Sequence, residues 1–231
     1  TPMHLPTLSD AQAEALSGIH AAFAEKPITL LHGVTSSGKT EIYAHLIDFA
    51  LQQQTQVLYL VPEIALTSQL TTRLQQFFGN KLIVYHSKFS DNERVEIWNR
   101  ILHTNEPIVV IGARSSIFLP FAKLGLVIVD EEHDQSYKQF DPAPRYNGRD
   151  TAIMLAHMHG AKTLLGSATP SVETYYKATS GKYGLVTLSQ RYNDVALPEI
   201  EIIDVSKEWK KKAMDGAFAM STISAVRNAI G

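Results

Sequence analysis

Short apolar runs alternate with longer amphipathic stretches along most of this 231-residue chain. The apolar runs lie at residues 28–33, 56–62, 82–87, 107–112, 124–129 and 161–166. They are continuous rather than interrupted at every second residue, which is typical of strands buried on both faces of a sheet. Strands that alternate with helices predict an α/β fold, with a mostly parallel sheet and helices on both faces. Ligands of such sheets bind at the carboxyl ends of the strands.

Composition narrows the classes of protein that this chain can belong to. The length of 231 residues suits one sizeable domain and part of another, and 45% hydrophobic and 19% charged residues are ordinary values for a globular protein. A net charge of −2 gives no overall basic footprint for nucleic acid, although a local basic groove is compatible with it. The sequence has no Cys, which excludes disulfides and thiolate zinc sites within it. No apolar run is long enough for a membrane span and no signal peptide precedes the first strand, so we expect a cytoplasmic protein.

Residues 33–40 read GVTSSGKT and match the phosphate-binding pattern G-x-x-x-x-G-K-[ST]. They follow an apolar run and open a helical pattern, which is the context that this phosphate loop requires. Glycines let backbone amides point at phosphate oxygens, and the helix N-terminus adds a favourable dipole. We expect Lys39 to reach the β- and γ-phosphates of ATP and Thr40 to bind Mg²⁺. The predicted nucleotide-binding residues of the loop are Gly33, Val34, Thr35, Ser36, Ser37, Gly38, Lys39 and Thr40.

Residues 130–133, DEEH, form an acidic box directly after the apolar run GLVIV. Asp130 is placed to hold Mg²⁺ opposite Thr40, and Glu131 is placed to polarise an attacking water. Adjacent carboxylates at a buried strand end repel each other unless a cation or hydrogen-bond donors compensate. An ordinary acidic turn after a strand is the alternative. The phosphate loop in the same domain favours the catalytic interpretation.

Four segments occur in a fixed order, GVTSSGKTEIY, LVPEIALTSQ, DEEHDQSYKQ and GSATPS. Together they resemble the superfamily-two DExH helicases, and most closely the bacterial primosomal replication-restart helicases. The resemblance extends from about residue 8 to residue 204, and the second and third segments are its specific part. It implies a RecA-like lobe of a helicase that uses ATP to unwind DNA in the 3′-to-5′ direction. It also implies replication restart at stalled forks and primosome assembly.

The resemblance assigns roles to residues outside the phosphate loop. Gln12 corresponds to the glutamine that reads the adenine edge, with a surface helix residue as the alternative interpretation. His133, grouped with Lys39, Asp130 and Glu131 as catalytic, is expected to couple the nucleotide to residues 166–171, GSATPS. Amides and small hydroxyl groups suit the phosphate oxygens of a single strand and carry no sequence information. The strand contacts that the resemblance implies here are Pro62, Glu63, Thr67, Arg114 and Ser115.

Residues 135–150, QSYKQFDPAPRYNGRD, form an aromatic-basic loop directly after the acidic box. It resembles the aromatic-rich loop of replication-restart and RecQ helicases. Aromatic rings stack on unpaired bases and basic groups neutralise phosphates, so the loop is expected to bind single-stranded DNA and to shift the catalytic acids. The alternative is that its aromatic residues pack on the domain, with Tyr146 in the core. The predicted strand contacts of the loop are Tyr137, Lys138, Gln139, Arg145 and Arg149.

The expected organisation is a linker at residues 1–8, an ATP-binding lobe at residues 9–190 and an exit segment at residues 191–231. The pattern changes after Gly181, and the lysines at 210–212 are interpreted as a solvated face. Both ends of the sequence look cut, so we expect a piece of a longer protein. The family's zinc-binding cysteines, second lobe and N-terminal DNA-binding region are not in this sequence, so zinc is expected only elsewhere. Alone, this lobe should bind nucleotide with little turnover.

Three functions are compatible with this sequence. The first is a DNA motor lobe whose partners are single-stranded and forked DNA. Primosome proteins and single-strand binding protein follow by resemblance, with nucleoid association and no membrane. The second is a P-loop enzyme of another class, such as a small-molecule kinase, and the third is a non-catalytic nucleotide-binding interaction module. Ser36 stands where the family usually has Gly, so we expect a change in the flexibility of the phosphate loop that keeps the fixed positions of its motif. The nine histidines show no metal-binding pattern, and His157 and His159 are interpreted as structural.

Overall fold

The computed structural model of the chain describes residues 4–34, 37–86, 89–189 and 201–230. It contains two compact units, Thr1–Asp194 and Val195–Gly231. The described residues of the first unit form a seven-stranded sheet with the order β3-β4-β2-β5-β6-β1-β7. Its strands are β1 (Ile28–Gly33), β2 (Gln56–Leu60), β3 (Leu82–Tyr85), β4 (Val109–Gly112), β5 (Leu124–Asp130), β6 (Lys162–Ser167) and β7 (Gly184–Leu188). All neighbouring pairs are parallel, which confirms the predicted fold class.

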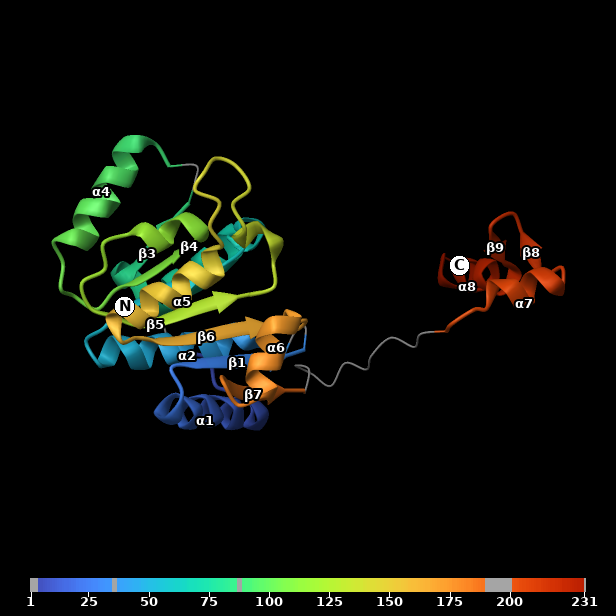
Figure 1. The fold of residues 1–231 in the computed structure, drawn as a ribbon, viewed down its shortest axis with the longest axis horizontal. Helices are drawn as coiled ribbons and strands as arrows, with labels where there is room; N and C mark the ends of the chain where they lie inside the picture. The colour runs from blue at the N-terminus through green and yellow to red at the C-terminus, as the bar shows by residue number, and fades with distance from the viewer. Residues whose placement is uncertain (1–3, 35–36, 87–88, 190–200, 231) are drawn as a thin grey trace. The chain divides into compact units, whose positions relative to one another are not determined.

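Helices precede and connect the strands, as Figure 1 shows. They are α1 (Asp10–Glu25), α2 (Lys39–Gln52), α3 (Ser68–Phe78), α4 (Asp91–Leu102), α5 (Gly148–His159) and α6 (Val172–Thr179). Short 3-10 turns are η1 (Glu63–Ala65), η2 (Gly79–Lys81), η3 (Arg114–Phe118) and η4 (Gln135–Tyr137). Side-chain caps fix several helix starts: Ser9 and Gln12 form a capping box on α1, and Ser171 caps α6.

The core has two halves, one on each face of the sheet. Neighbouring residues of one strand point to opposite faces, so Leu31 and Tyr59 belong to one half, and Leu30 and Leu58 to the other. Helices α1, α2 and α3 cover the first half, and α4, α5, α6 and η3 contribute to the second. The first unit is therefore a three-layer α/β/α arrangement, which explains why the strand sequences are apolar at nearly every position.

The strand order determines which motifs meet. Strands β5, β6 and β1 lie side by side, with Asp130 of β5 paired to Gly166 of β6, and Leu31 of β1 paired to the same Gly166. The acidic box, residues 166–171 and the phosphate loop follow these three strands. Because the strands are parallel, all three motifs emerge at one edge of the sheet.

The second unit is small and exposes much of its apolar surface. It contains α7 (Val205–Lys210), β8 (Met214–Asp215), β9 (Phe218–Ala219) and α8 (Met220–Ile230). Trp209, Phe218 and Ile230 are exposed, as are the lysines at 210–212. Residues 201–204 form neither helix nor strand, and residues 190–200 lie outside the described residues.

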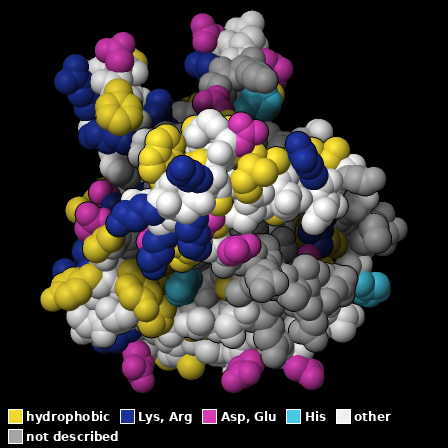
Figure 2. All heavy atoms as spheres, turned by 90° about the vertical axis from the view of Figure 1, so that its right-hand side faces the viewer, with side chains coloured by type: hydrophobic (Ala, Val, Ile, Leu, Met, Phe, Trp, Pro, Cys, Tyr) yellow, Lys and Arg dark blue, Asp and Glu magenta, His cyan; other side chains and the backbone are white. Residues whose placement is uncertain are grey.

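Figure 2 shows Lys and Arg side chains mixed with acidic and hydrophobic ones on the face that it draws. Such a mixture agrees with the net charge of −2 and gives no uniformly basic face in this view. In the part of the chain that the structure describes, no helix combines the length and the apolar character that a membrane span requires.

Candidate nucleotide-binding and hydrolysis site

An open pocket of about 370 Å³ lies where the phosphate loop and the acidic box meet. It is lined by Ser37, Gly38, Lys39, Thr40, Glu41, Arg73, Asp130 and Glu131. The structure thus brings Lys39, Thr40, Asp130 and Glu131 to one pocket, although the two pairs lie about ninety residues apart in the sequence. The pocket wall also contains an ion pair between Arg73 of α3 and Glu41 of α2.

The phosphate loop turns sharply before α2. Gly38 has φ 77°, a left-handed conformation that glycine adopts without strain, and Lys39 is the first residue of the helix. Lys39 Nζ donates to the Gly33 carbonyl oxygen at 3.2 Å and lies 3.7 Å from Glu131 Oε1. Ser37 Oγ is buried without a hydrogen-bond partner among the described residues. An orphaned hydroxyl and an ammonium held by weak partners suit the oxygens of a polyphosphate.

Other predicted loop residues are placed as follows. Gly33 ends β1, and a Cβ there would lie 3.0 Å from Ser37 Oγ and 3.1 Å from Lys39 Cγ, so a side chain would crowd the loop. The backbone amide of Val34 donates to the Leu188 carbonyl oxygen at 3.1 Å, which attaches the loop to β7. Thr35 and Ser36 lie outside the described residues.

Tyrosine side chains pack around Asp130. The Tyr43 hydroxyl donates to Asp130 Oδ1 at 2.9 Å, and the Tyr137 hydroxyl donates to the Asp130 carbonyl oxygen at 2.7 Å. The backbone amide of Glu131 also donates to Asp130 Oδ1, at 3.1 Å. The ring of Tyr59 packs edge-on against Tyr43, with centroids 5.5 Å apart. These contacts fix the orientation of the carboxylate that is predicted to hold Mg²⁺.

The charge of Asp130 is costly in the protein without a cation. Burial raises the pKa of its carboxyl group to about 6, and the neighbouring Glu131 charge adds to this shift. Tyr43 and Lys39 oppose the shift without cancelling it. A carboxylate in this position gains stability when a divalent cation binds, which fits its predicted role.

Stability without Mg²⁺ should therefore depend on pH through Asp130. The folded state keeps the proton up to about pH 6, whereas the unfolded chain loses it near its ordinary pKa of 3.8, so stability falls between these values and is flat above. Asp130→Asn removes this loss and should raise the unfolding free energy at neutral pH by about 3 kcal/mol, since one pKa unit is worth about 1.4 kcal/mol. Urea unfolding of both proteins from pH 4 to pH 7 measures this difference in unfolding free energy. An unfolding free energy that depends on pH about equally in the two proteins would contradict the prediction.

Tyr43 is a contact of Asp130 that the sequence motifs did not predict. It lies four residues after Lys39 on α2, and its hydroxyl occupies space that exists because residue 166 is a glycine. A Cβ at Gly166 would lie 1.8 Å from the Tyr43 hydroxyl oxygen. The small residue in GSATPS thus permits the hydrogen bond that orients Asp130.

Tyr43→Phe should weaken Mg²⁺ binding specifically. Loss of such an orienting partner typically lowers metal affinity by about tenfold or more, so the Mg²⁺ concentration for half-maximal nucleotide binding should rise by about that factor. A fluorescent ATP analogue titrated at increasing Mg²⁺ measures it. Tyr183→Phe is the matched control, because Tyr183 is buried in the other half of the core and does not line the nucleotide pocket. Equal Mg²⁺ requirements in both variants would contradict the role of Tyr43.

Glu131 and His133 connect the pocket to the segment after β6. Glu131 has φ 45°, a strained conformation for a residue with a Cβ, and its side chain is 36% exposed. Its Oε2 lies 3.7 Å from His133 Nδ1. The same nitrogen lies 2.8 Å from Ser167 Oγ, and Nε2 lies 3.3 Å from Thr169 Oγ1. His133 therefore contacts GSATPS directly, and its coupling of the nucleotide to this segment stays a prediction.

Gln12 lies beneath the phosphate loop and is only 2% exposed. Its Nε2 donates to the carbonyl oxygens of Gly38 at 3.2 Å and Ser37 at 3.5 Å. Its Oε1 accepts the Ser9 amide in the capping box of α1. The side chain is thus next to the nucleotide pocket but is bonded to protein atoms, and adenine recognition by Gln12 stays a prediction.

The predicted contacts to single-stranded DNA that precede the acidic box in the sequence lie in two segments. Pro62 is buried, whereas Glu63 and Thr67 are exposed at η1 and at the start of α3. Arg114 and Ser115 are half-buried in η3. The Arg114 guanidinium donates from Nη1 to the carbonyl oxygens of Ser136 at 2.9 Å and Lys138 at 3.0 Å, so it supports the aromatic-basic loop from inside.

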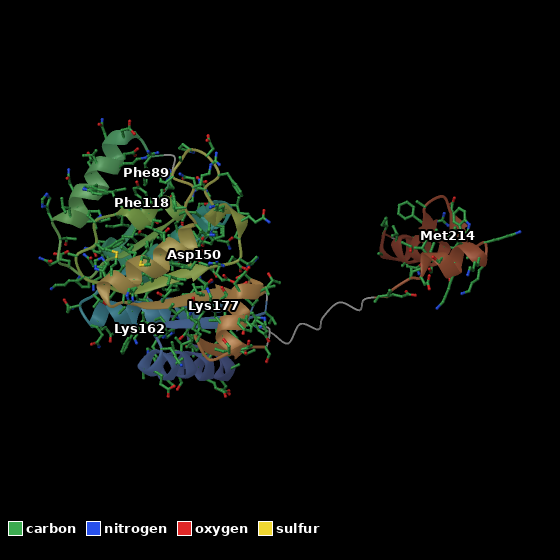
Figure 3. All side chains as sticks on the ribbon, in the orientation of Figure 1. Phe89, Phe118, Asp150, Lys162, Lys177 and Met214 are labelled. Atoms are coloured by element: carbon green, nitrogen blue, oxygen red, sulfur yellow. The ribbon has the colours of Figure 1, made fainter. Side chains whose placement is uncertain are left out.

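The aromatic-basic loop combines buried and exposed members. Tyr137 is 1% exposed, so stacking of its ring on a base would require the loop to open. Tyr146 packs edge-on against Phe118, whose side chain Figure 3 labels, with ring centroids 5.1 Å apart. Phe140 is 68% exposed, and Arg145 is also exposed. The exposed surface for stacking is thus Phe140 rather than Tyr137.

The loop is held in a hairpin-like shape by its own polar groups. Lys138 pairs with Asn147, and Lys138 Nζ donates to the Arg145 carbonyl oxygen at 2.6 Å. Gln139 Nε2 donates to the carbonyl oxygens of Pro142 at 2.7 Å and Pro144 at 3.0 Å. The predicted strand contacts Lys138 and Gln139 therefore also stabilise the loop.

Metal sites in proteins are commonly built from several His, Cys, Asp or Glu side chains, so we consider their arrangement in the described residues. No group of three or more His, Cys, Asp or Glu side chains is arranged there to hold a metal ion. His157 and His159 are exposed in the last turn of α5, where cationic side chains suit the helix dipole.

Comparisons with known proteins agree with this geometry. Residues 9–178 match the family model described as DEAD/DEAH box helicase. The chain is 51% identical over 204 residues to replication restart protein PriA of Rickettsia felis, which covers 88% of this chain and 31% of that protein. It is 43% identical over 203 residues to PriA of Bacillus subtilis, covering 87% of this chain and 25% of that protein. The chain thus spans about a third or less of these relatives.

Solved structures show the same fold at lower identity. RecG bound to a three-way DNA junction superimposes with a TM-score of 0.58 and 24% identity, covering 81% of this chain and 24% of that one. Helicase Lhr of Mycobacterium smegmatis, bound to single-stranded DNA and a nucleotide analogue, gives a TM-score of 0.54 and 23% identity, covering 79% and 26%. Together, the sheet, the phosphate loop, the acidic box and the family match show that this chain belongs to the DEAD/DEAH box helicases and forms one RecA-like helicase lobe.

Proposed function

We propose that this chain is the ATP-binding motor lobe of a DNA helicase that restarts replication at stalled forks. The observation that carries the proposal is the convergence of Lys39, Asp130, Glu131 and His133 at one edge of the sheet, with the aromatic-basic loop attached to the same acidic box. A nucleotide site and a surface for unpaired bases thus share a few covalently linked residues.

Each pocket residue has a role that follows from its position. Lys39 binds phosphate oxygens, and Thr40 and Asp130 would hold Mg²⁺, which when bound neutralises charge on those oxygens. Glu131, partly exposed at the pocket, accepts a proton from the attacking water. His133 lies between Glu131 and Ser167, so it can transmit a change in the acidic box to GSATPS.

The DNA side of the proposal rests on exposed groups. Phe140 offers an exposed ring for an unpaired base, and Arg145 offers an exposed cation for a phosphate. Lys138 is half-buried and would have to release the Arg145 carbonyl oxygen to offer a second cation. By similarity to PriA, the partners are single-stranded and forked DNA, primosome proteins and single-strand binding protein. The proposal also includes unwinding in the 3′-to-5′ direction and a cytoplasmic, nucleoid-associated location. Zinc is proposed only for other parts of a longer protein.

Unwinding of labelled partial duplexes tests the motor function. A protein that joins this chain to a second motor lobe should separate a duplex with a 3′ single-stranded tail, and a matched 5′-tailed duplex much less. Phe140→Ala should reduce unwinding at limiting DNA, since loss of one base–aromatic stack costs about 1–3 kcal/mol. Nucleotide hydrolysis without any unwinding would favour the alternative, a P-loop enzyme of another class. Nucleotide binding without hydrolysis would favour an interaction module.

A further inference from the structure

Glu132 is a buried acid that takes no part in the nucleotide pocket. Its side chain has no exposed surface, and its carboxylate accepts from Ser171 N at 2.6 Å, Arg149 Nη1 at 2.8 Å and Thr174 Oγ1 at 2.9 Å. Ser171 Oγ adds a longer bond at 3.3 Å. A buried carboxylate with this many donors is tolerated only because they compensate its lost hydration.

The Glu132 carboxylate joins three segments that are distant in the sequence. Its own backbone lies between Glu131 and His133, and its amide donates to the Gly166 carbonyl oxygen at 3.1 Å. Ser171 is the last residue of GSATPS and the N-cap of α6. Arg149 is in the first turn of α5, where the aromatic-basic loop ends. A shift of Glu132 therefore has to move the residues on both sides of it in the acidic box.

Arg149 is directed toward the protein rather than toward solvent. Its side chain is 15% exposed, and besides Glu132 it contacts Ser171 Oγ from Nη1 at 3.1 Å. Its Nε donates at 2.9 Å to Asp150, whose side chain Figure 3 labels on α5. A guanidinium with these partners has to break a buried ion pair before it binds a DNA phosphate. Arg145, in the same loop, is exposed and has no such obstacle.

We propose that Glu132 and Arg149 form an internal clamp that fixes the aromatic-basic loop and the start of α6 relative to the catalytic acid Glu131. Arg149 is then a positioning residue and not a phosphate contact. The part of this inference that concerns DNA rests on the proposed function, because it takes the loop to face a single strand. The part that concerns the position of the loop depends only on the ion pair between Glu132 and Arg149.

Hydrogen exchange on this chain tests the clamp without DNA. Arg149→Met leaves a buried carboxylate without its cation, so amides of residues 138–147 and of the first turn of α6 should exchange at least about tenfold faster than in the wild type. Glu132→Gln combined with Arg149→Met removes the uncompensated charge and should return exchange toward the wild-type rate. Unchanged exchange in Arg149→Met, or equal acceleration across the whole sheet without rescue by the double variant, would overturn the clamp.

Salt dependence of binding to labelled oligothymidine separates a clamp from a phosphate contact. Arg145→Met should reduce the slope of log K against log salt by about 0.7, the value for one lost contact on a single strand. Arg149→Met should leave the slope at the wild-type value even where affinity falls. An equal loss of slope in Arg149→Met would overturn its assignment. Absence of wild-type binding would instead count against the proposed DNA function, and the exchange experiment would still decide the clamp.

Discussion

Replacing Glu131 by Gln is expected to slow ATP hydrolysis by about 10²- to 10⁴-fold while nucleotide still binds, the range that positioned general bases contribute. The Gln side chain keeps the size of Glu131 but cannot accept the proton of the attacking water. The 3.7 Å approach of Glu131 to Lys39 is lost as an ion pair, so phosphate binding should be equal or slightly tighter. Steady-state kcat and KM in a protein that joins this chain to a second motor lobe measure both effects.

The matched control for this prediction is Glu96→Gln. Glu96 is an exposed acid on α4, outside the nucleotide pocket, so its loss should leave kcat unchanged. Hydrolysis by Glu131→Gln within a few-fold of the wild type would mean that another group activates the water. A large rise in KM at constant kcat would instead assign Glu131 to nucleotide binding.

Lys39→Ala is expected to weaken nucleotide binding by this chain about 10- to 10²-fold, because a hydrogen bond to a charged group is worth about 1.5–3 kcal/mol. Lys39 Nζ is already at the phosphate loop, 3.2 Å from the Gly33 carbonyl oxygen, so little rearrangement is needed for it to reach a phosphate. A titration with a fluorescent ATP analogue and Mg²⁺ measures the loss.

Lys162→Ala is the control for this second prediction. Lys162, labelled in Figure 3, begins β6 at the amino end of the strand, and its Nζ donates to the Lys26 carbonyl oxygen at 3.3 Å. Its removal changes the net charge by the same amount but leaves the phosphate loop intact. Equal affinity in Lys39→Ala and wild type would show that nucleotide binds somewhere other than the phosphate loop.

The sequence predicted the helices and strands themselves better than it predicted which of them lie side by side. Continuous apolar runs such as residues 124–129 identify buried strands, and GVTSSGKT specifies its own strand–loop–helix context, so the α/β class followed from local pattern. Strand order is a property of long-range packing, which no local pattern records. The hydrogen bond between Tyr43 and Asp130, eighty-seven residues apart, depends on that order and was therefore missed.

In the sixteen-residue aromatic-basic loop, too, the sequence did not predict which side chains are buried. Composition presents Tyr137, Phe140 and Tyr146 as equivalent rings, yet Tyr137 is buried, Tyr146 packs on Phe118 and Phe140 is exposed. Likewise, Arg145 and Arg149 are indistinguishable by charge. Only the buried carboxylate of Glu132 separates them, because it binds Arg149. Residue type predicts which interactions are available, and tertiary packing decides which are used.

DNA-stimulated ATP hydrolysis tests the central claim of a nucleic-acid motor most directly. The protein is this chain joined to a second motor lobe, assayed without DNA, with single-stranded DNA and with forked DNA, and Lys39→Ala serves as the control. We predict strong stimulation by DNA that disappears in Lys39→Ala, and little hydrolysis by this chain alone. Hydrolysis that is indifferent to DNA would contradict the account, because the loop that follows Glu131 would then not sense a strand.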